Sequence, residues 1–324
     1  MSKAVKILFI VAAALIFCGF ILFAAQMSVY GWDLNRLGAE NYETNTNIVS
    51  ESFSDISVDT DSADITFLAS QGGECKVVCF EERSAKHRVC VENGVLKITR
   101  VNEKSWYEYV GFNFKSQSIK VYLPEAEYGA LSVKADTANL TLPSALSLEN
   151  LEVSLDTGDI SIGSSVSGAA KITAKTGKFS VKEAAFGLLK ATLSTGRVSI
   201  SDVECGEITL GQTTGAVSLN RIKCRSLVSS GTTGDLDMNG VLVSGLLKIE
   251  RSTGDVSFEN CDAGEILIET RTGDVEGSLL SEKVFIAKSS TGEVEVPKTS
   301  IGGRCEITTK TGDIEIELSR RTHN

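Results

Sequence analysis

The chain has 324 residues, with 29 glycines, 3 prolines and 2 histidines. This composition favours β-structure over helix and disfavours chemistry that depends on histidine. The formal net charge is -10, with acidic and basic residues interspersed. Nucleic-acid binding requires a concentrated basic patch, so we expect no nucleic-acid partner.

The N-terminal segment predicts a transmembrane helix. Residues 7–25 read ILFIVAAALIFCGFILFAA, which is long enough to cross the core of a bilayer. Lys3 and Lys6 precede this run and place its N-terminus in the cytoplasm, with the rest of the chain outside. A cleaved signal peptide is the alternative, but Phe23 lies where a cleavage site prefers a small residue. We therefore expect residues 1–32 to be a cytoplasmic tip and a signal-anchor helix.

The next two segments differ from each other in periodicity. Residues 33–50 are polar and show no apolar period, so we expect a spacer. Between 51 and 125 the segments CKVVCF, GVLKITRV and SIKVYLP each predict a strand, at irregular intervals. We expect residues 51–125 to be an irregular β region that caps a regular one on the membrane side.

A charged and aromatic stretch interrupts this irregular region. Its aromatic residues are Trp106, Tyr107, Tyr109, Phe112 and Phe114. They form either a contact patch for a glycan, a peptide or the membrane interface, or a lid over the open end of the β-structure. We favour the lid.

A Thr-Gly step then recurs at intervals of 19 or 20 residues. We expect its glycines to form tight turns, because glycine reaches positive φ without strain. They are Gly158, Gly177, Gly196, Gly215, Gly234, Gly254, Gly273, Gly292 and Gly312. Apolar residues lie two positions after and seven before each glycine, and four after and five before it in all repeats but one each. They alternate with polar residues, which predicts two half-buried strands in each repeat.

Such a short unit cannot bury its inward face alone, but stacked copies can. We therefore predict an all-β fold, a single-stranded β-solenoid of about ten coils over residues 126–319, preceded by one transmembrane helix and followed by a tail at 320–324. No segment of the repeat region has a helical period long enough for an α/β crossover.

The opening SFSDISVDTDSADITF, the strand SIKVYLP followed by LSVKADTANLTL, and the tandem STGDV-type coils lie behind an N-terminal membrane helix. In this combination the chain resembles the bacterial putative-adhesin family with tandem β-strand repeats, over about residues 50–318. The resemblance implies a β-solenoid and, for some members, a link to envelope stress in Gram-positive bacteria. The family's domain has no assigned activity, so the resemblance transfers no catalytic residue and no cofactor.

One repeat matches the aspartic-peptidase signature, VSLDTGD at 153–159. That chemistry needs two carboxylates that share a proton across a cleft. The position of Asp156 is instead filled in later repeats by Lys175, Ser194, Thr213, Thr232, Ser252, Arg271, Ser290 and Lys310. We interpret the match as drift within a structural repeat and predict no catalytic residue.

The residue after the glycine is acidic in the last five repeats. These acids are Asp235, Asp255, Asp274, Glu293 and Asp313. Stacked carboxylates repel one another unless cations or bases offset them. We expect a solvated charged edge with no metal site, and weak cation binding is the alternative, because each turn offers too few oxygen ligands for a tight site.

The cysteines show no CxxC or CxxH spacing, so we expect buried packing rather than metal binding. Outside the cytoplasm, one disulfide among Cys75, Cys79 and Cys90 is compatible with their spacing.

We therefore predict a non-enzymatic, adhesin-like binding or scaffold protein, held in the cell membrane by a single helix with its C-terminal domain outside. The expected partners are the membrane, a cell-wall polymer or another envelope protein, and a second copy paired end to end. One alternative is an envelope-stress accessory protein that signals through its helix. Another is a carbohydrate-active β-helix enzyme, which the constant repeat spacing disfavours because it leaves no room for long loops.

Overall fold

The computed structural model describes residues 3–29, 31–32, 42–83, 85–102 and 116–319. These residues contain one helix, α1 (Lys3–Val29), and a single sheet system of 23 strands. Within α1, the segment Val5–Val29 contains an 18-residue stretch with a mean hydropathy of 3.0, which makes this the one described helix long and apolar enough to cross a membrane.

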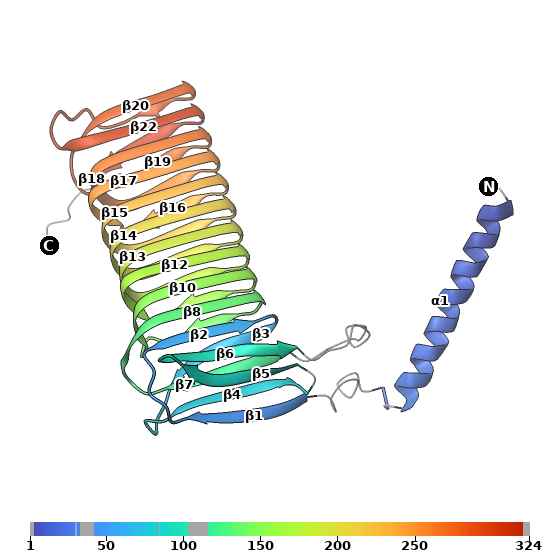
Figure 1. Cartoon of the computed structure of the whole chain (residues 1–324). Coiled ribbons are helices and arrows are strands. Elements are labelled where there is room, and N and C mark those ends of the chain that lie inside the picture. The colour runs from blue at the N-terminus through green and yellow to red at the C-terminus, as the bar shows by residue number, and fades with distance from the viewer. Residues whose placement is uncertain (1–2, 30, 33–41, 84, 103–115, 320–324) are drawn as a thin grey trace.

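The strands form a β-solenoid of about nine turns, close to the number predicted (Figure 1). Seven strands form the N-terminal part: β1 (Tyr42–Val49), β2 (Asp55–Thr60), β3 (Ala63–Ala69), β4 (Cys75–Glu82), β5 (Ala85–Glu92), β6 (Val95–Asn102) and β7 (Gln117–Leu123). The central strands are β8 (Glu127–Thr137), β9 (Leu140–Leu142), β10 (Ser147–Thr157), β11 (Ile160–Ile162), β12 (Ser165–Thr176), β13 (Phe179–Thr195), β14 (Val198–Thr214) and β15 (Val217–Thr233). The C-terminal strands are β16 (Leu236–Asn239), β17 (Leu242–Thr253), β18 (Val256–Thr272), β19 (Val275–Leu279), β20 (Lys283–Thr291), β21 (Val294–Glu295), β22 (Gly303–Thr311) and β23 (Ile314–Leu318).

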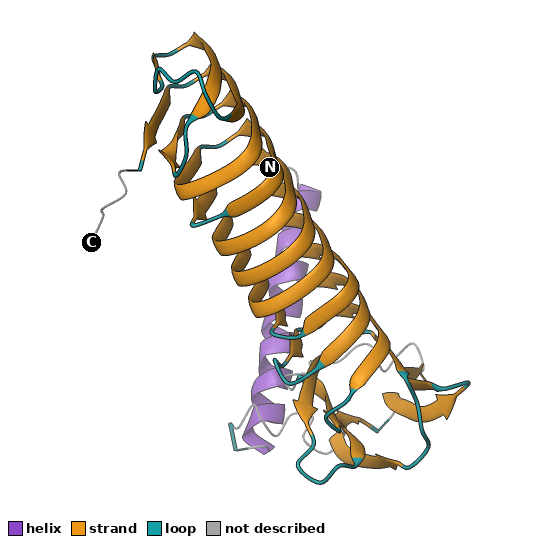
Figure 2. Ribbon diagram, turned by 90° about the vertical axis from the view of Figure 1, so that its left-hand side faces the viewer, coloured by secondary structure: helices purple, strands orange, loops and turns teal. Residues whose placement is uncertain are grey.

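Successive coils pair in parallel and in register, so equivalent residues stack. Between β13 and β14, for example, Phe179 pairs with Val198 and Leu189 with Ile208. Most inward positions therefore continue through the stack as columns of apolar side chains, as the alternation predicted. Figure 2 shows the same regular stack from the side.

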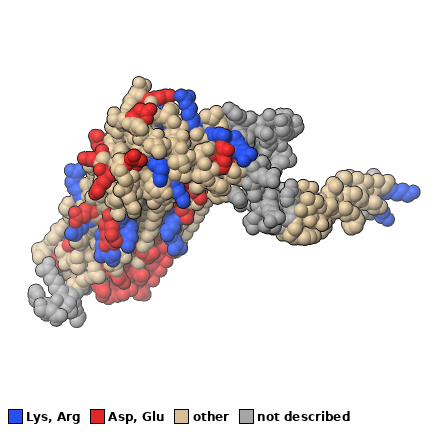
Figure 3. All heavy atoms as spheres, turned by 90° about the horizontal axis from the view of Figure 1, so that it is seen from below, with Lys and Arg blue, Asp and Glu red and all other residues tan. Residues whose placement is uncertain are grey.

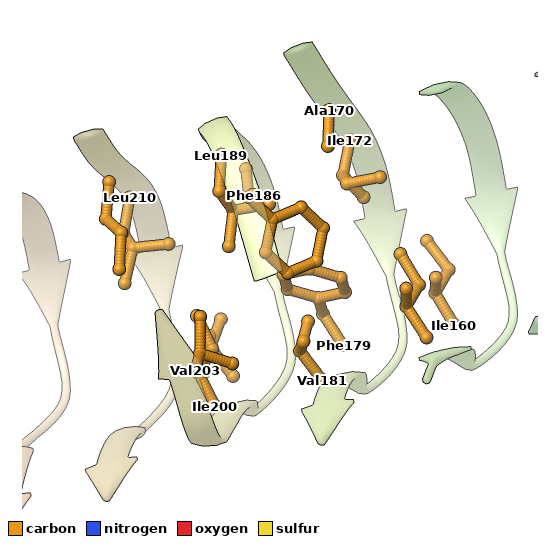
Figure 4. Packing of buried hydrophobic residues seen from close by; sticks show 14 of the residues in the cluster. Ile160, Ala170, Ile172, Phe179, Val181, Phe186, Leu189, Ile200, Val203 and Leu210 are labelled. Carbon is orange, nitrogen blue, oxygen red and sulfur yellow. The ribbon is translucent and has the colours of Figure 1, made fainter. Parts of the chain in front are cut away.

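The inward columns merge into one continuous apolar core. Phe179 is completely buried, and Figure 4 shows it beside Phe186 and Val181 within the coil, with Ile160 in the coil before. Burial of an aromatic or branched aliphatic side chain of this kind stabilises a fold by about 1.5–3 kcal/mol. Stacking is what makes this burial available to a repeat that has no second layer of its own.

The Thr-Gly step forms a corner at which only glycine fits. Eight of the nine predicted glycines have φ between 129° and 150°, and Gly292 is the exception. A Cβ atom at Gly196 would also overlap the carbonyl oxygen of Gly177 in the preceding coil. Backbone conformation and the close approach of neighbouring coils therefore both exclude a side chain here.

The third apolar pair of some repeats predicts a short third side, and the coils do have two further corners, although the residues that form them were not identified from the sequence. At the first, residues with φ between 50° and 63° recur in consecutive coils: Glu183, Asp202, Arg221, Gly240 and Asn260. At the second, a column nine positions before the Thr-Gly glycine is mostly glycine: Gly129, Gly168, Gly187, Gly206, Gly245, Gly264 and Gly303. A Cβ atom at Gly168 would lie 2.7 Å from the carbonyl oxygen of Glu149.

These corners give the coils a third side. Its apolar pairs include Val203 with Cys205 and Ile222 with Cys224. Val203 and Ile222 are fully buried, so the third side contributes to the same core.

The coils do not stack in sequence order at the ends of the solenoid. Near the C-terminus, β22 pairs with β18 on one side and with β20 on the other. Likewise β23 lies between β19 and β21. The last coil in sequence is thus the next to last in space, and residues 283–295 form the end coil.

In the N-terminal region, too, the strands do not stack in sequence order. The coil of β2 and β3 stacks against β8 and β9 on one side and against β6 and β7 on the other. Strands β4, β5 and β1 then pair antiparallel at the end of the stack. The segments CKVVCF, GVLKITRV and SIKVYLP are strands, as predicted.

One part of the predicted spacer is a strand. Residues 42–49 form β1, in which Thr44 pairs with Phe80 and Ile48 with Lys76 of β4. The sequence YETNTNIV has few apolar residues, so it lacks the apolar–polar alternation that would predict a strand. Its place beside β4 depends on the tertiary structure.

Candidate binding surface

The acids of the Thr-Gly corner accept backbone hydrogen bonds between coils. Asp235 Oδ1 accepts the N–H of Asp255 at 3.0 Å, and Asp255 Oδ1 accepts that of Asp274 at 2.9 Å. Asp274 Oδ1 accepts the N–H of Asp313 at 2.8 Å, and Asp313 Oδ1 that of Glu293 at 2.7 Å. We call this row of five residues the acidic ladder. Its carboxylates satisfy N–H groups at a corner where the strand ladder is interrupted.

The order of the acidic ladder differs from the sequence order. Asp313 lies between Asp274 and Glu293, because the last two coils exchange places. Within the described residues, the one group of three metal-ligating side chains within 4.8 Å is Cys79, Glu81 and His87, which lies outside the ladder. The solvated charged edge without a metal site stays the prediction for the ladder, with weak cation binding as its alternative.

The cluster of Cys79, Glu81 and His87 is buried between N-terminal strands. Glu81 Oε2 accepts hydrogen bonds from His87 N–H and interacts with His87 Nδ1, each at 2.7 Å, and Oε1 accepts from Asn45 Nδ2 at 2.7 Å. His87 Nε2 lies 2.8 Å from Thr60 Oγ1. The imidazole and the carboxylate are therefore satisfied by each other and by β1 and β2.

The charge state of this cluster follows from its contacts. Burial acts to raise the pKa of Glu81, but the hydrogen bonds from His87 and Asn45 outweigh it and hold the pKa below its usual value. Burial, with the nearby Glu81 charge, raises the pKa of Cys79 to about 12, so its thiol stays protonated. A metal would have to displace these hydrogen bonds and the thiol proton, so we interpret the cluster as a structural tie between β1, β2, β4 and β5.

Asp156, the acid of the peptidase-like repeat, lies on the outer face. Its carboxylate is 2.7 Å from Lys175 Nζ of the next coil, and both side chains are substantially exposed. Similar pairs join Glu152 to Lys171 at 2.7 Å and other equivalent positions of neighbouring coils. Each exposed pair contributes at most about 1 kcal/mol. This environment favours the structural interpretation of the peptidase-like match.

The predicted aromatic patch of Trp106, Tyr107, Tyr109, Phe112 and Phe114 lies outside the described residues. The disulfide considered among Cys75, Cys79 and Cys90 is absent, and all eight cysteines are free thiols. Cys75 and Cys79 point into the core of the N-terminal coils, where they pack as apolar side chains.

Charged side chains of both signs cover the solenoid. Figure 3 shows them intermixed on the face seen from below, with one area where acidic side chains gather.

A groove of about 550 Å³ crosses several coils on one face, over the strands that lead into the Thr-Gly corner. Small and hydroxylated side chains make up most of its lining, with charged ones at the C-terminal end. The lining includes Thr192, Gly211, Gln212, Thr213, Ser230, Gly231, Thr232, Glu250, Arg251, Ser252, Glu269, Thr270, Arg271 and Lys310. The groove was not predicted, because it depends on glycines that replace larger side chains in single coils: Gly211 in an outward column and Gly231 in an inward one.

Comparison with known proteins gives the following matches. A family model described as Toastrack DUF4097 matches residues 53–239 and 207–323. No curated protein sequence matches significantly.

Among solved structures, the chain is similar to a putative adhesin from Bacteroides fragilis, with 14% identity, 86% of this chain and 98% of that one covered, and a TM-score of 0.42. It is also similar to a putative adhesin from Parabacteroides merdae, with 12% identity, 73% and 96% covered, and a TM-score of 0.46. A putative lipid binding protein from Parabacteroides distasonis matches with 15% identity, 73% and 94% covered, and a TM-score of 0.44.

Proposed function

Since the chain belongs to the Toastrack DUF4097 family, which confirms its resemblance to the putative adhesins, we propose that it is a non-enzymatic binding or scaffold protein of the cell surface. The groove across the coils is the observation that carries this proposal. It is long, shallow and lined by hydroxyl groups, which suits an extended polar ligand more than a small substrate.

The proposed location is the outer side of the cell membrane. Helix α1 would be the single anchor, with Lys3 and Lys6 on the cytoplasmic side. Outside the membrane, the solenoid would present its groove to cell-wall polymer or to another envelope protein. We retain the domain division into an anchor, an irregular β region and a regular solenoid as part of this proposal.

Photo-crosslinking on intact Gram-positive cells tests the function. A crosslinkable residue at Thr213 or Thr232 lies in the groove, and one at Ser161 is exposed on a different side of the coil as a matched control. Recovery of wall polymer or a surface protein from the groove positions but not from Ser161 supports the proposal. Recovery of only a sensor kinase or transporter would instead support the envelope-stress accessory protein.

Protease treatment of the same intact cells tests the topology. Because the proposal places the solenoid outside the membrane, we expect the protease to digest it or release it from intact cells. Full protection in intact cells together with digestion after lysis would contradict the proposed orientation.

We also propose that the end coil pairs with a second copy of the chain. Among the described residues, strand β20 pairs along one edge only, with β22. Val284 and Ile286, on its outer face, are 40% and 50% exposed. The free edge has the same register as the coils beneath it, so another end coil is the partner that matches it best.

A further inference from the structure

A buried arginine occupies a position that earlier coils fill with apolar side chains. Arg251 lies in the inward column whose members in preceding coils are Leu155, Ala174 and Leu193. In later coils the column turns polar, with Gln212 paired to Gly231 and Gly231 paired to Arg251. The change from apolar to polar coincides with the groove.

The guanidinium of Arg251 has no counter-charge. The residue is 5% exposed, and no carboxylate of the described residues lies within ion-pair distance of it. Nη2 donates a hydrogen bond to Ser229 Oγ at 2.9 Å, while Nε has no hydrogen-bond partner. Burying an ionised group without a partner is costly, and burial lowers the pKa of Arg251 accordingly.

The neighbouring coil makes room for this side chain. A Cβ atom at Gly231 would overlap Nη1 of Arg251, so the glycine leaves the space that the guanidinium occupies. The next residue of the column, Gln212, donates from Nε2 to the carbonyl oxygen of Gly196 at 2.5 Å. Its Oε1 is buried and has no partner. A donor on Arg251 and an acceptor on Gln212 are thus both unsatisfied in the lining of one groove.

The acidic residues that line the groove do not supply a counter-charge for Arg251. Glu250 and Glu269 line it, but Glu250 pairs with Lys248 Nζ at 2.7 Å rather than with Arg251. Arg271 and Lys310 add positive charge to the same lining. An anionic group in the groove would therefore meet one buried and two further cationic side chains.

We propose that this groove binds an acidic glycan, with Arg251 as the ligand for its carboxylate. A planar guanidinium matches a carboxylate through paired N–H donors. The hydroxyl groups of the same sugar match the serine and threonine hydroxyls that line the groove, such as Ser230 and Thr232. The inference rests on the proposed binding function and names the chemical class of its ligand.

Calorimetry on the full chain in detergent micelles tests the assignment. The probes are an oligogalacturonate, a neutral galactose oligomer of the same length, and inorganic phosphate. We expect the oligogalacturonate to bind and the neutral oligomer not to. Binding of phosphate alone, or of neither anion, overturns the acidic-glycan assignment.

Variants identify the residue responsible. Arg251→Leu restores the residue type of the earlier coils and should weaken oligogalacturonate binding by roughly 10- to 100-fold. Arg225→Leu is the matched control, because it removes the same charge from an exposed arginine outside the groove, paired with Glu207. Equal loss in both variants, or no loss in Arg251→Leu, refutes the role of Arg251.

A measurement without variants guards against a folding defect. The melting temperature of the unmodified chain should rise with oligogalacturonate concentration, as mass action requires of a ligand that binds the native state. Without ligand, Arg251→Leu should melt at or above the unmodified chain, because it replaces an unpaired buried charge with an apolar side chain. These readouts are independent of crosslinking on cells, so the surface function and its ligand class can fail separately.

Discussion

Replacement of Gly196 by alanine tests why the Thr-Gly corner requires glycine. The native φ of Gly196 is 150°, a conformation that costs other residues of order 1–3 kcal/mol. Its Cβ would also overlap the carbonyl oxygen of Gly177, and forcing such neighbours apart costs about another 1–3 kcal/mol. We expect Gly196→Ala to destabilise the fold by roughly 2–6 kcal/mol in total.

Gly211→Ala is the matched control in the following coil. A Cβ atom there would be 3.8 Å from its nearest neighbour, Thr192 Oγ1, and the φ of Gly211 is not positive. We expect its stability to change by no more than about 0.5 kcal/mol.

Circular dichroism melts of the full chain, with hydrogen exchange resolved by peptide, measure both effects. The melting temperature of Gly196→Ala should fall by roughly 5–15 °C. The loss of protection should be centred on the coils around residues 177 and 215, because repeat stacks transmit strain mainly to their neighbours. If Gly196→Ala and Gly211→Ala melt alike, the steric explanation of the corner is wrong.

Three other predictions concern the buried cluster, the thiols and the end coil. The native pKa of Glu81 is depressed, so its contribution to stability is present above the unfolded-state pKa of about 4.5 and is lost as pH falls through the native pKa. In urea unfolding, the stability of Glu81→Gln should depend less on pH in that range. At neutral pH its free energy of unfolding should be lower by about 2 kcal/mol. Burial raises the pKa of Cys224 and Cys305 to about 12, so a thiol reagent at pH 8 should label both only after unfolding, and rapid labelling of the native chain would contradict their burial. Sedimentation in detergent should show concentration-dependent dimers that Ile286→Lys abolishes, and the same monomer content in both proteins would exclude pairing through β20.

The regular coils were predictable because each of their determinants is local and repeated. Glycine spacing marked one corner, and period-two alternation identified inward residues such as Phe179 and Ile208. The corner at Asp202 was missed because different residue types tolerate its left-handed conformation, so no single residue marks the column.

The candidate site was less predictable, since it depends on departures from the repeat. Arg251 and Gln212 stand out only once their column is known to face inward. The hydrogen bonds of the acidic ladder needed the geometry of two neighbouring coils, although the stacking of its acids was expected. In each case the site is marked by a residue that differs between coils. A search for the residues that all coils share does not detect such a difference.

The exchanged order of the last two coils is explained by which residues stack at equivalent positions of neighbouring coils. Gly303 lies so close to Gly264 that a Cβ atom there would overlap its carbonyl oxygen, whereas the equivalent position of the neighbouring coil is Lys283. Stacking the coil with Gly303 directly on Gly264 avoids that overlap and leaves Lys283 free to pair with Asp262 at 2.6 Å.

This order also changes which part of the chain meets solvent at the end of the solenoid. The end coil is continuous with folded chain on both sides, at Leu279 and at Gly303, and is not a free terminus. Chain ends fray because nothing restrains them beyond their last contact. A coil tethered at both ends loses less entropy when it docks than a terminal coil of the same length. The exchange therefore stabilises the coil that carries the exposed edge of β20, and it keeps that edge ordered for pairing.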